Sequence, residues 1–115
     1  MFEVIIAAVI IAALLAAALI PPMTLLWAGA IVGTLGALVG VPAGFVYHAR
    51  LWRALHAEDL DTEGMWLRPH HLHRKLSDAR REPIVVLFAI GAAGFGLTIL
   101  GAVAVVAAIV RLAAV

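Results

Sequence analysis

The chain has 115 residues, of which 65% are hydrophobic and only 13% are charged, and its mean hydropathy is +1.12. Soluble domains are about half apolar and about a quarter charged, so this composition argues against a water-soluble protein. The sequence contains no cysteine, which excludes disulfides, thiolate metal sites and thiol catalysis. No Asp, Glu, Lys or Arg occurs from Val4 to Tyr47 or from Pro83 to Val110.

The first of these apolar stretches is too long for one membrane span. At about 1.5 Å per residue it would form a helix of roughly 66 Å, about twice the thickness of the hydrocarbon core. Pro21 and Pro22 remove two backbone donors and disfavour a helical Ile20. We therefore expect spans over 2–20 and 23–47, joined as a tight antiparallel hairpin. The start, MFE, lacks the basic region of a secretory signal, so the first span is expected to be retained.

The second span carries glycines at intervals of four, three, four and four residues, which places them on one helix face. In lipid, small residues let two helix backbones approach closely, so this face is predicted to pack against another helix. The first span offers a complementary stripe of small residues at Ala8, Ala12 and Ala16. The glycines are Gly29, Gly33, Gly36, Gly40 and Gly44.

The third span is predicted over 83–110, with Pro83 in its first turn. Gly91, Gly94 and Gly101 give it a second small-residue face for helix packing. The fold class is therefore all-α, a single integral membrane domain of three transmembrane helices with a charged segment over 48–82.

The charged segment holds seven of the eight Lys and Arg residues. The positive-inside rule places such a segment in the cytoplasm, so the N-terminus is expected inside and the C-terminus outside, as a multi-pass protein of a bacterial inner membrane. We expect the basic residues, together with Trp52 and Trp66, to bind anionic lipids or an acidic partner surface. The basic residues are Arg50, Arg53, Arg68, Arg74, Lys75, Arg80 and Arg81.

Two helical pieces are predicted within this segment. The second span is expected to continue past the interface through YHARLWRALHAEDL. After DTEGMWLRP, a short amphipathic helix is expected to rest its Leu72, Leu76 and Ala79 stripe in the headgroup layer. A nucleic-acid partner is disfavoured, because the segment is short, tethered and interspersed with acids.

We expect the histidines to belong to a solvated face of the segment at the membrane interface. Two other hypotheses are that they bind a metal ion or that they bind haem. His70 and His73 lie at i, i+3, and neutral imidazole is a common metal ligand, but the surrounding cations would repel a metal ion. His48 and His56 lie on one helix face within YHARLWRALHAEDL. This segment is similar to the haem-ligating segment of the three-helix anchor subunits of some respiratory enzymes, although the likeness includes no distinctive motif.

That resemblance implies haem b on His48 or His56. A second axial histidine would have to come from a partner chain, because the first and third spans contain none. Otherwise we expect no cofactor and no catalysis, since no nucleophile–base pair and no ionisable residue inside a span is present. The expected function is an accessory or stabilising subunit of a larger membrane complex, respiratory or photosynthetic, with larger integral subunits as partners, or a homo-oligomer. The alternative is a haem- or quinone-binding anchor subunit of an electron-transfer enzyme.

Overall fold

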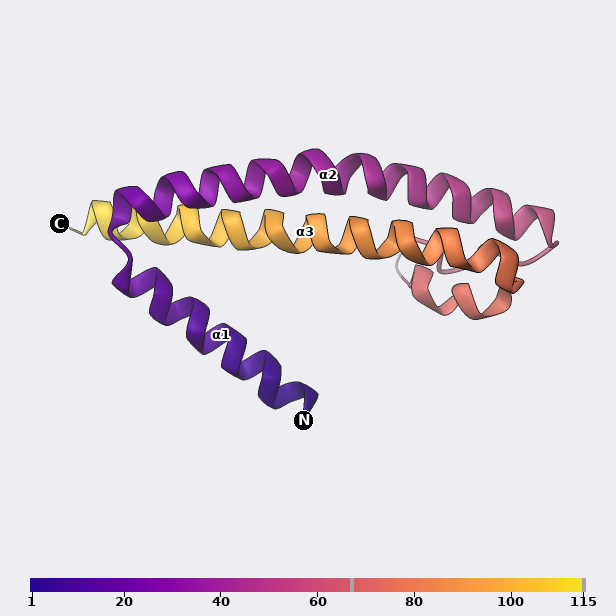
Figure 1. Cartoon of the computed structure of the whole chain (residues 1–115), viewed down its shortest axis with the longest axis horizontal. Coiled ribbons are helices and arrows are strands. Elements are labelled where there is room, and N and C mark those ends of the chain that lie inside the picture. Colours follow the sequence, from indigo (N-terminus) through magenta and orange to yellow (C-terminus); the bar gives the residue numbers. More distant parts are fainter. Residues whose placement is uncertain (67, 115) are drawn as a thin grey trace. The chain divides into compact units, whose positions relative to one another are not determined.

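The computed structural model describes residues 1–66 and 68–114, and these residues form helices and no strand (Figure 1). Each of the three α-helices is long enough to cross a membrane and contains an 18-residue stretch that is apolar enough, with mean hydropathies over that stretch of 2.8, 1.9 and 2.4. The prediction of an all-helical chain with three such helices is confirmed, and it indicates a membrane protein. The elements are α1 (Phe2–Leu19), α2 (Pro22–Ala57), the 3-10 turns η1 (Pro69–His71) and η2 (His73–Lys75), and α3 (Asp78–Ala113).

Helix α1 ends where the sequence predicts, because Ile20 adopts an extended backbone (ψ 137°) in front of Pro21. No residue of α1 is buried. Ala8, Ala12 and Ala16 are all exposed, so the structure does not use them as the complement of the glycines in α2.

Helices α2 and α3 extend beyond the predicted spans. Helix α2 continues past Tyr47 to Ala57, as the sequence predicts, whereas α3 begins at Asp78 and not at the predicted Pro83. The start of α3 lies upstream because the Ser77 carbonyl accepts from the backbone N–H groups of Arg80 and Arg81 at 3.1 and 2.9 Å. Pro83 then costs the helix only one hydrogen bond. A helix of 36 residues is about 54 Å long, which exceeds the roughly 30 Å hydrocarbon core, so each of these two helices has a portion outside it.

The chain forms two units, Met1–Thr34 with Thr98–Val115, and Leu35–Leu97. In the first unit, α2 and α3 approach at glycines. A Cβ atom added to Gly29 would lie 2.8 Å from both the Ala104 Cβ and the Gly101 carbonyl oxygen, and one added to Gly33 would lie 3.4 Å from the Gly101 Cα. Gly29 and Gly101 are buried, so hydrogen is the only side chain that fits there without a shift of the neighbouring helix.

The first unit also ties the end of α1 to α3 through one arginine. Arg111 Nη1 donates to the Ala17 carbonyl oxygen at 2.8 Å and to the Ile20 carbonyl oxygen. The last carbonyl groups of a helix have no partner within the helix and carry its partial negative charge. Arg111 therefore caps the C-terminal end of α1.

In the second unit, α2 and α3 run antiparallel with their backbones in contact. A Cβ atom added to Gly94 would lie 2.5 Å from the Gly40 Cα and 2.8 Å from the Gly36 carbonyl oxygen, and one added to Gly91 would lie 3.6 Å from the Gly44 nitrogen. We call these five residues the glycine seam. The small-residue faces that the sequence offers to other helices thus contact each other here, while their predicted role in binding a partner chain stays a prediction.

Candidate functional site

A small core of ordinary side chains lies where the charged segment meets the two long helices. Residues Tyr47, Leu51, Ala54 and Leu55 recur on one face of α2 with helical spacing, and Leu51 and Leu55 are fully buried. From the segment and from α3, apolar side chains complete the cluster. We call it the leucine core, and it comprises Tyr47, Leu51, Ala54, Leu55, Met65, Leu72, Leu76 and Ile84.

The position of Leu72 and Leu76 corrects the prediction of an amphipathic helix resting on the membrane. The segment forms the two 3-10 turns η1 and η2 in place of an α-helix, and both leucines are almost completely buried, at 4% and 3% exposure. Their apolar stripe meets Leu51 and Leu55, because the extension of α2 past Tyr47 presents an apolar face of its own. Ala79 is exposed in α3.

His73 is the buried polar side chain of this core, with 8% of its surface exposed. Its Nε2 atom is hydrogen-bonded to the Tyr47 hydroxyl at 2.6 Å. The imidazole also meets the Tyr47 and Phe88 rings edge-on, with centroids 5.7 and 5.2 Å away. Burial lowers the pKa of His73 below its ordinary value, and the neighbouring charge of His70 lowers it further. Sequence reasoning did not identify Tyr47 and Phe88 as partners of this histidine.

His48 lies on the other side of Tyr47, with ring centroids 5.0 Å apart. Its Nδ1 atom lies 2.8 Å from the Gly44 carbonyl oxygen, which can only accept, so Nδ1 carries the proton. The ring stacks on Trp66 at 4.5 Å and 10°. Nε2 is buried and has no hydrogen-bond partner. In the neutral ring this atom holds a lone pair that can accept a hydrogen bond or bind a metal.

The remaining histidines, His56, His70 and His71, are exposed, and His70 lies near enough to His73 for its charge to lower the pKa of that residue. His56 Nδ1 lies 3.0 Å from the Trp52 carbonyl oxygen, and its ring is 4.0 Å from the Trp52 indole. The rings of His70 and His71 lie against each other, with centroids 4.2 Å apart. The positive charge of His70, above all, lowers the pKa of His71. Within residues 1–66 and 68–114, no group of three or more His, Asp or Glu residues could hold a metal ion.

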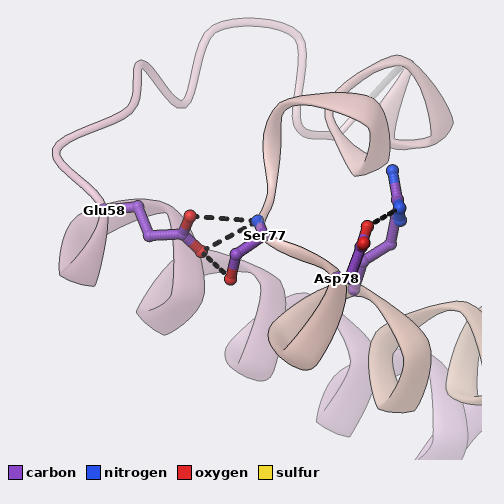
Figure 2. Close-up of polar contacts among 4 residues, drawn as sticks. Glu58, Ser77 and Asp78 are labelled. Carbon is purple, nitrogen blue, oxygen red and sulfur yellow. Dashed lines mark hydrogen bonds and ion pairs between the residues drawn. The ribbon is translucent and has the colours of Figure 1, made fainter.

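The basic residues divide into paired and unpaired ones. Arg80 and Arg81 form ion pairs with Glu58 and Asp78, the former with 3.7 Å between Arg80 Nε and Glu58 Oε2. Glu58 also accepts from the Ser77 backbone N–H at 3.0 Å and from its hydroxyl at 3.3 Å, so it joins the end of α2 to the start of α3 (Figure 2). In the part of the chain that the structure describes, the exposed basic residues without an ion pair are Arg50, Arg53, Arg68, Arg74 and Lys75.

The two tryptophans predicted to bind lipid or a partner both reach the surface. Trp52 is 49% exposed and Trp66 is 71% exposed, although Trp66 also covers His48. Indole rings of this kind favour the boundary between membrane and water. Comparison with known protein families, with curated proteins and with solved structures finds no match to this chain.

Proposed function

We propose that this chain is a small accessory or stabilising subunit of a larger complex in a bacterial inner membrane, and that α1 is the helix that binds its neighbours. The observation that supports this is the contrast between the helices. The small-residue faces of α2 and α3 contact each other, whereas α1 has no buried residue. Its stripe of Ala8, Ala12 and Ala16 would let the helix of a larger integral subunit, or of a second copy, approach closely.

The proposed orientation has the N-terminus in the cytoplasm and the C-terminus outside. Seven of eight basic residues support it, since they lie in the segment between the second and third spans. The five cations without an ion pair are proposed to contact anionic lipid headgroups, each contributing about 1 kcal/mol near the surface. A reporter enzyme that is active only outside the cytoplasm, fused to the C-terminus, should be active. Activity of the same reporter inserted after Gly64 would contradict this orientation.

The docking role of α1 is tested by co-purification in mild detergent. Replacing both Ala8 and Ala12 with leucine should remove the partner subunits, or the second copy, because the longer side chains hold the helices apart. The matched control replaces Ala7 and Ala18 with leucine, since these residues lie on the same helix but away from that stripe. The control should keep its partners. Equal retention by both variants would show that this face binds nothing.

A haem-binding anchor subunit is the competing candidate, and His48 is the observation that favours it. Metal-bound histidines usually donate one ring N–H to a carbonyl or carboxylate and bind the metal through the other nitrogen. In His48, Nδ1 donates to the Gly44 carbonyl oxygen and Nε2 has no hydrogen-bond partner. A quinone carbonyl needs a donor, which the bare Nε2 atom of a neutral ring is not. The geometry therefore favours haem iron over a quinone. An absorption spectrum of the gently purified protein tests this: a Soret band that is lost in His48→Ala but kept in His56→Ala would support it.

A further inference from the structure

The Tyr47–His73 contact joins two parts of the chain that are far apart in sequence. Tyr47 belongs to α2, and His73 opens η2 in the charged segment, 26 residues later. Both side chains are buried, at 3% and 8% exposure. Side-chain hydrogen bonds also join Glu58, directly after α2, to Ser77, but at an exposed position. The hydrogen bond inside the leucine core is thus the buried one that holds the segment.

We propose that the Tyr47–His73 pair is an acid-sensitive latch, which keeps the segment around η1 and η2 docked on the ends of α2 and α3 at neutral pH and releases it on acidification. The latch holds Leu72 and Leu76, which flank His73 and fill the leucine core. Releasing His73 would therefore expose both leucines.

The groups that face His73 do not neutralise an added proton. Helix α2 contributes the Tyr47 hydroxyl and α3 contributes the uncharged Phe88 ring. The segment itself contributes His70, whose charge opposes protonation of His73. Among the described residues no carboxylate forms an ion pair with His73. A buried charge without a partner is unfavourable, so protonation favours the state in which the imidazole reaches water.

The direction of the pH effect follows from linkage. The pKa of His73 is lowered in the docked state and takes its ordinary value near 6.5 in the released state. Above about pH 6.5 neither state binds the proton, and docking is at its most stable. As the pH falls towards the lowered pKa, only the released state binds it, so docking weakens. Each unit of difference between the two pKa values shifts the ratio of docked to released chain by about tenfold.

The released segment has the side chains needed to bind an anionic membrane surface. Leu72 and Leu76, once exposed, would lie beside the unpaired cations Arg74 and Lys75. Apolar side chains next to basic ones bind the headgroup layer of an anionic membrane. The acid form is thus expected to rest on the membrane surface, and the neutral form on the protein's own helices.

Distance measurements between spin labels test the latch. Because the chain has no cysteine, two can be introduced at exposed sites, Ala49→Cys in α2 and Lys75→Cys in η2, in protein reconstituted into bilayers. The parent should give one narrow distance distribution at about pH 8 and a broad, longer one at about pH 5. His73→Gln, which keeps a hydrogen-bond acceptor but does not titrate in this range, should stay narrow at both. His71→Gln, at an exposed position two residues away, should behave like the parent.

A parent distribution that does not change with pH would overturn the proposal, as would a His73→Gln variant that opens with the parent's pH profile. If the His73→Gln variant gives a broad distance distribution even at about pH 8, the proposal is tested instead by an NMR pH titration of the histidine ring resonances of the parent. A midpoint for His73 below the ordinary histidine value near 6.5 supports the latch. A midpoint at or above that value rejects it.

Discussion

The glycine seam and the leucine core lie in the same unit and are built on the same two helices, yet they pack in opposite ways. In the seam, the backbones of α2 and α3 touch at Gly40 and Gly94, where no side chain fits. In the core, Leu51 and Leu55 are enclosed by side chains from the charged segment. The surrounding medium explains the difference. In lipid, no hydrophobic effect drives apolar side chains together, so helices associate through close backbone contact. In water, the hydrophobic effect favours burial of leucine side chains in a core.

The strongest way to break this contrast is to place a side chain in the seam. Gly94→Leu would drive a side chain into the backbone of Gly40, because even its Cβ atom would lie 2.5 Å from the Gly40 Cα. We expect a loss of at least about 3 kcal/mol in the free energy of unfolding in detergent micelles, from overpacking that the backbone cannot absorb. Gly96→Leu is the matched control, since Gly96 is exposed and has open space around it.

The control should unfold at the parent's midpoint or slightly above, because leucine favours the helix more than glycine does. Equal losses in Gly94→Leu and Gly96→Leu would show that helix propensity, and not contact between α2 and α3, governs this region.

The leucine core should respond to removal of a side chain. Leu55 has no exposed surface, so Leu55→Ala removes buried methyl groups and leaves a cavity, which costs about 2–5 kcal/mol in free energy of unfolding. Leu38→Ala, at a position 66% exposed on the same helix, should cost little. Chemical unfolding followed by tryptophan fluorescence measures both. A large loss for Leu38→Ala would mean that its face of α2 is covered by another chain.

The features that the sequence predicts correctly are those that depend on local backbone geometry. Pro21 and Pro22 mark the end of α1, and the glycine intervals mark the contact faces, because backbone sterics act locally. The prediction that Leu72 and Leu76 rest on the membrane is wrong, because both are buried against α2 and α3. An apolar stripe indicates that something covers it, but its period does not distinguish a membrane from the chain's own helices.

The histidines illustrate a second limit. His70, His71 and His73 are close in sequence, and only His73 is buried. Its partners Tyr47 and Phe88 lie 26 and 15 residues away. A local spacing rule compares neighbours in the chain, whereas this site depends on contacts between α2, η2 and α3. The start of α3 at Asp78 depends in the same way on a distant residue, Glu58, which accepts the Ser77 N–H.

Removing the hydroxyl of Tyr47 should destabilise the leucine core and leave the contacts of the glycine seam unchanged. Tyr47→Phe keeps the ring but leaves His73 Nε2 buried without a partner, which costs about 1–2 kcal/mol. Thermal unfolding of Tyr47→Phe, His73→Phe and the double variant forms a double-mutant cycle, because phenylalanine fills the place of the imidazole without a hydrogen-bond acceptor. We expect the two losses to be clearly non-additive, because the residues share one hydrogen bond. Additive losses would mean that the 2.6 Å contact contributes nothing to stability.

The smallest expected effect lies at the edge of the core, where Glu58 joins the end of α2 to the start of α3. Glu58→Gln keeps one oxygen for the Ser77 N–H but removes the charge that attracts Arg80. Because the Arg80 side chain is 46% exposed, water and salt screen this pair, and the loss should stay below about 1 kcal/mol and shrink at high ionic strength. Asp78→Asn, whose carboxylate is 91% exposed, is the control and should have no measurable effect. If Asp78→Asn cost as much as Glu58→Gln, the ion pair between Glu58 and Arg80 would contribute no more to stability than the exposed pair of Asp78 and Arg81.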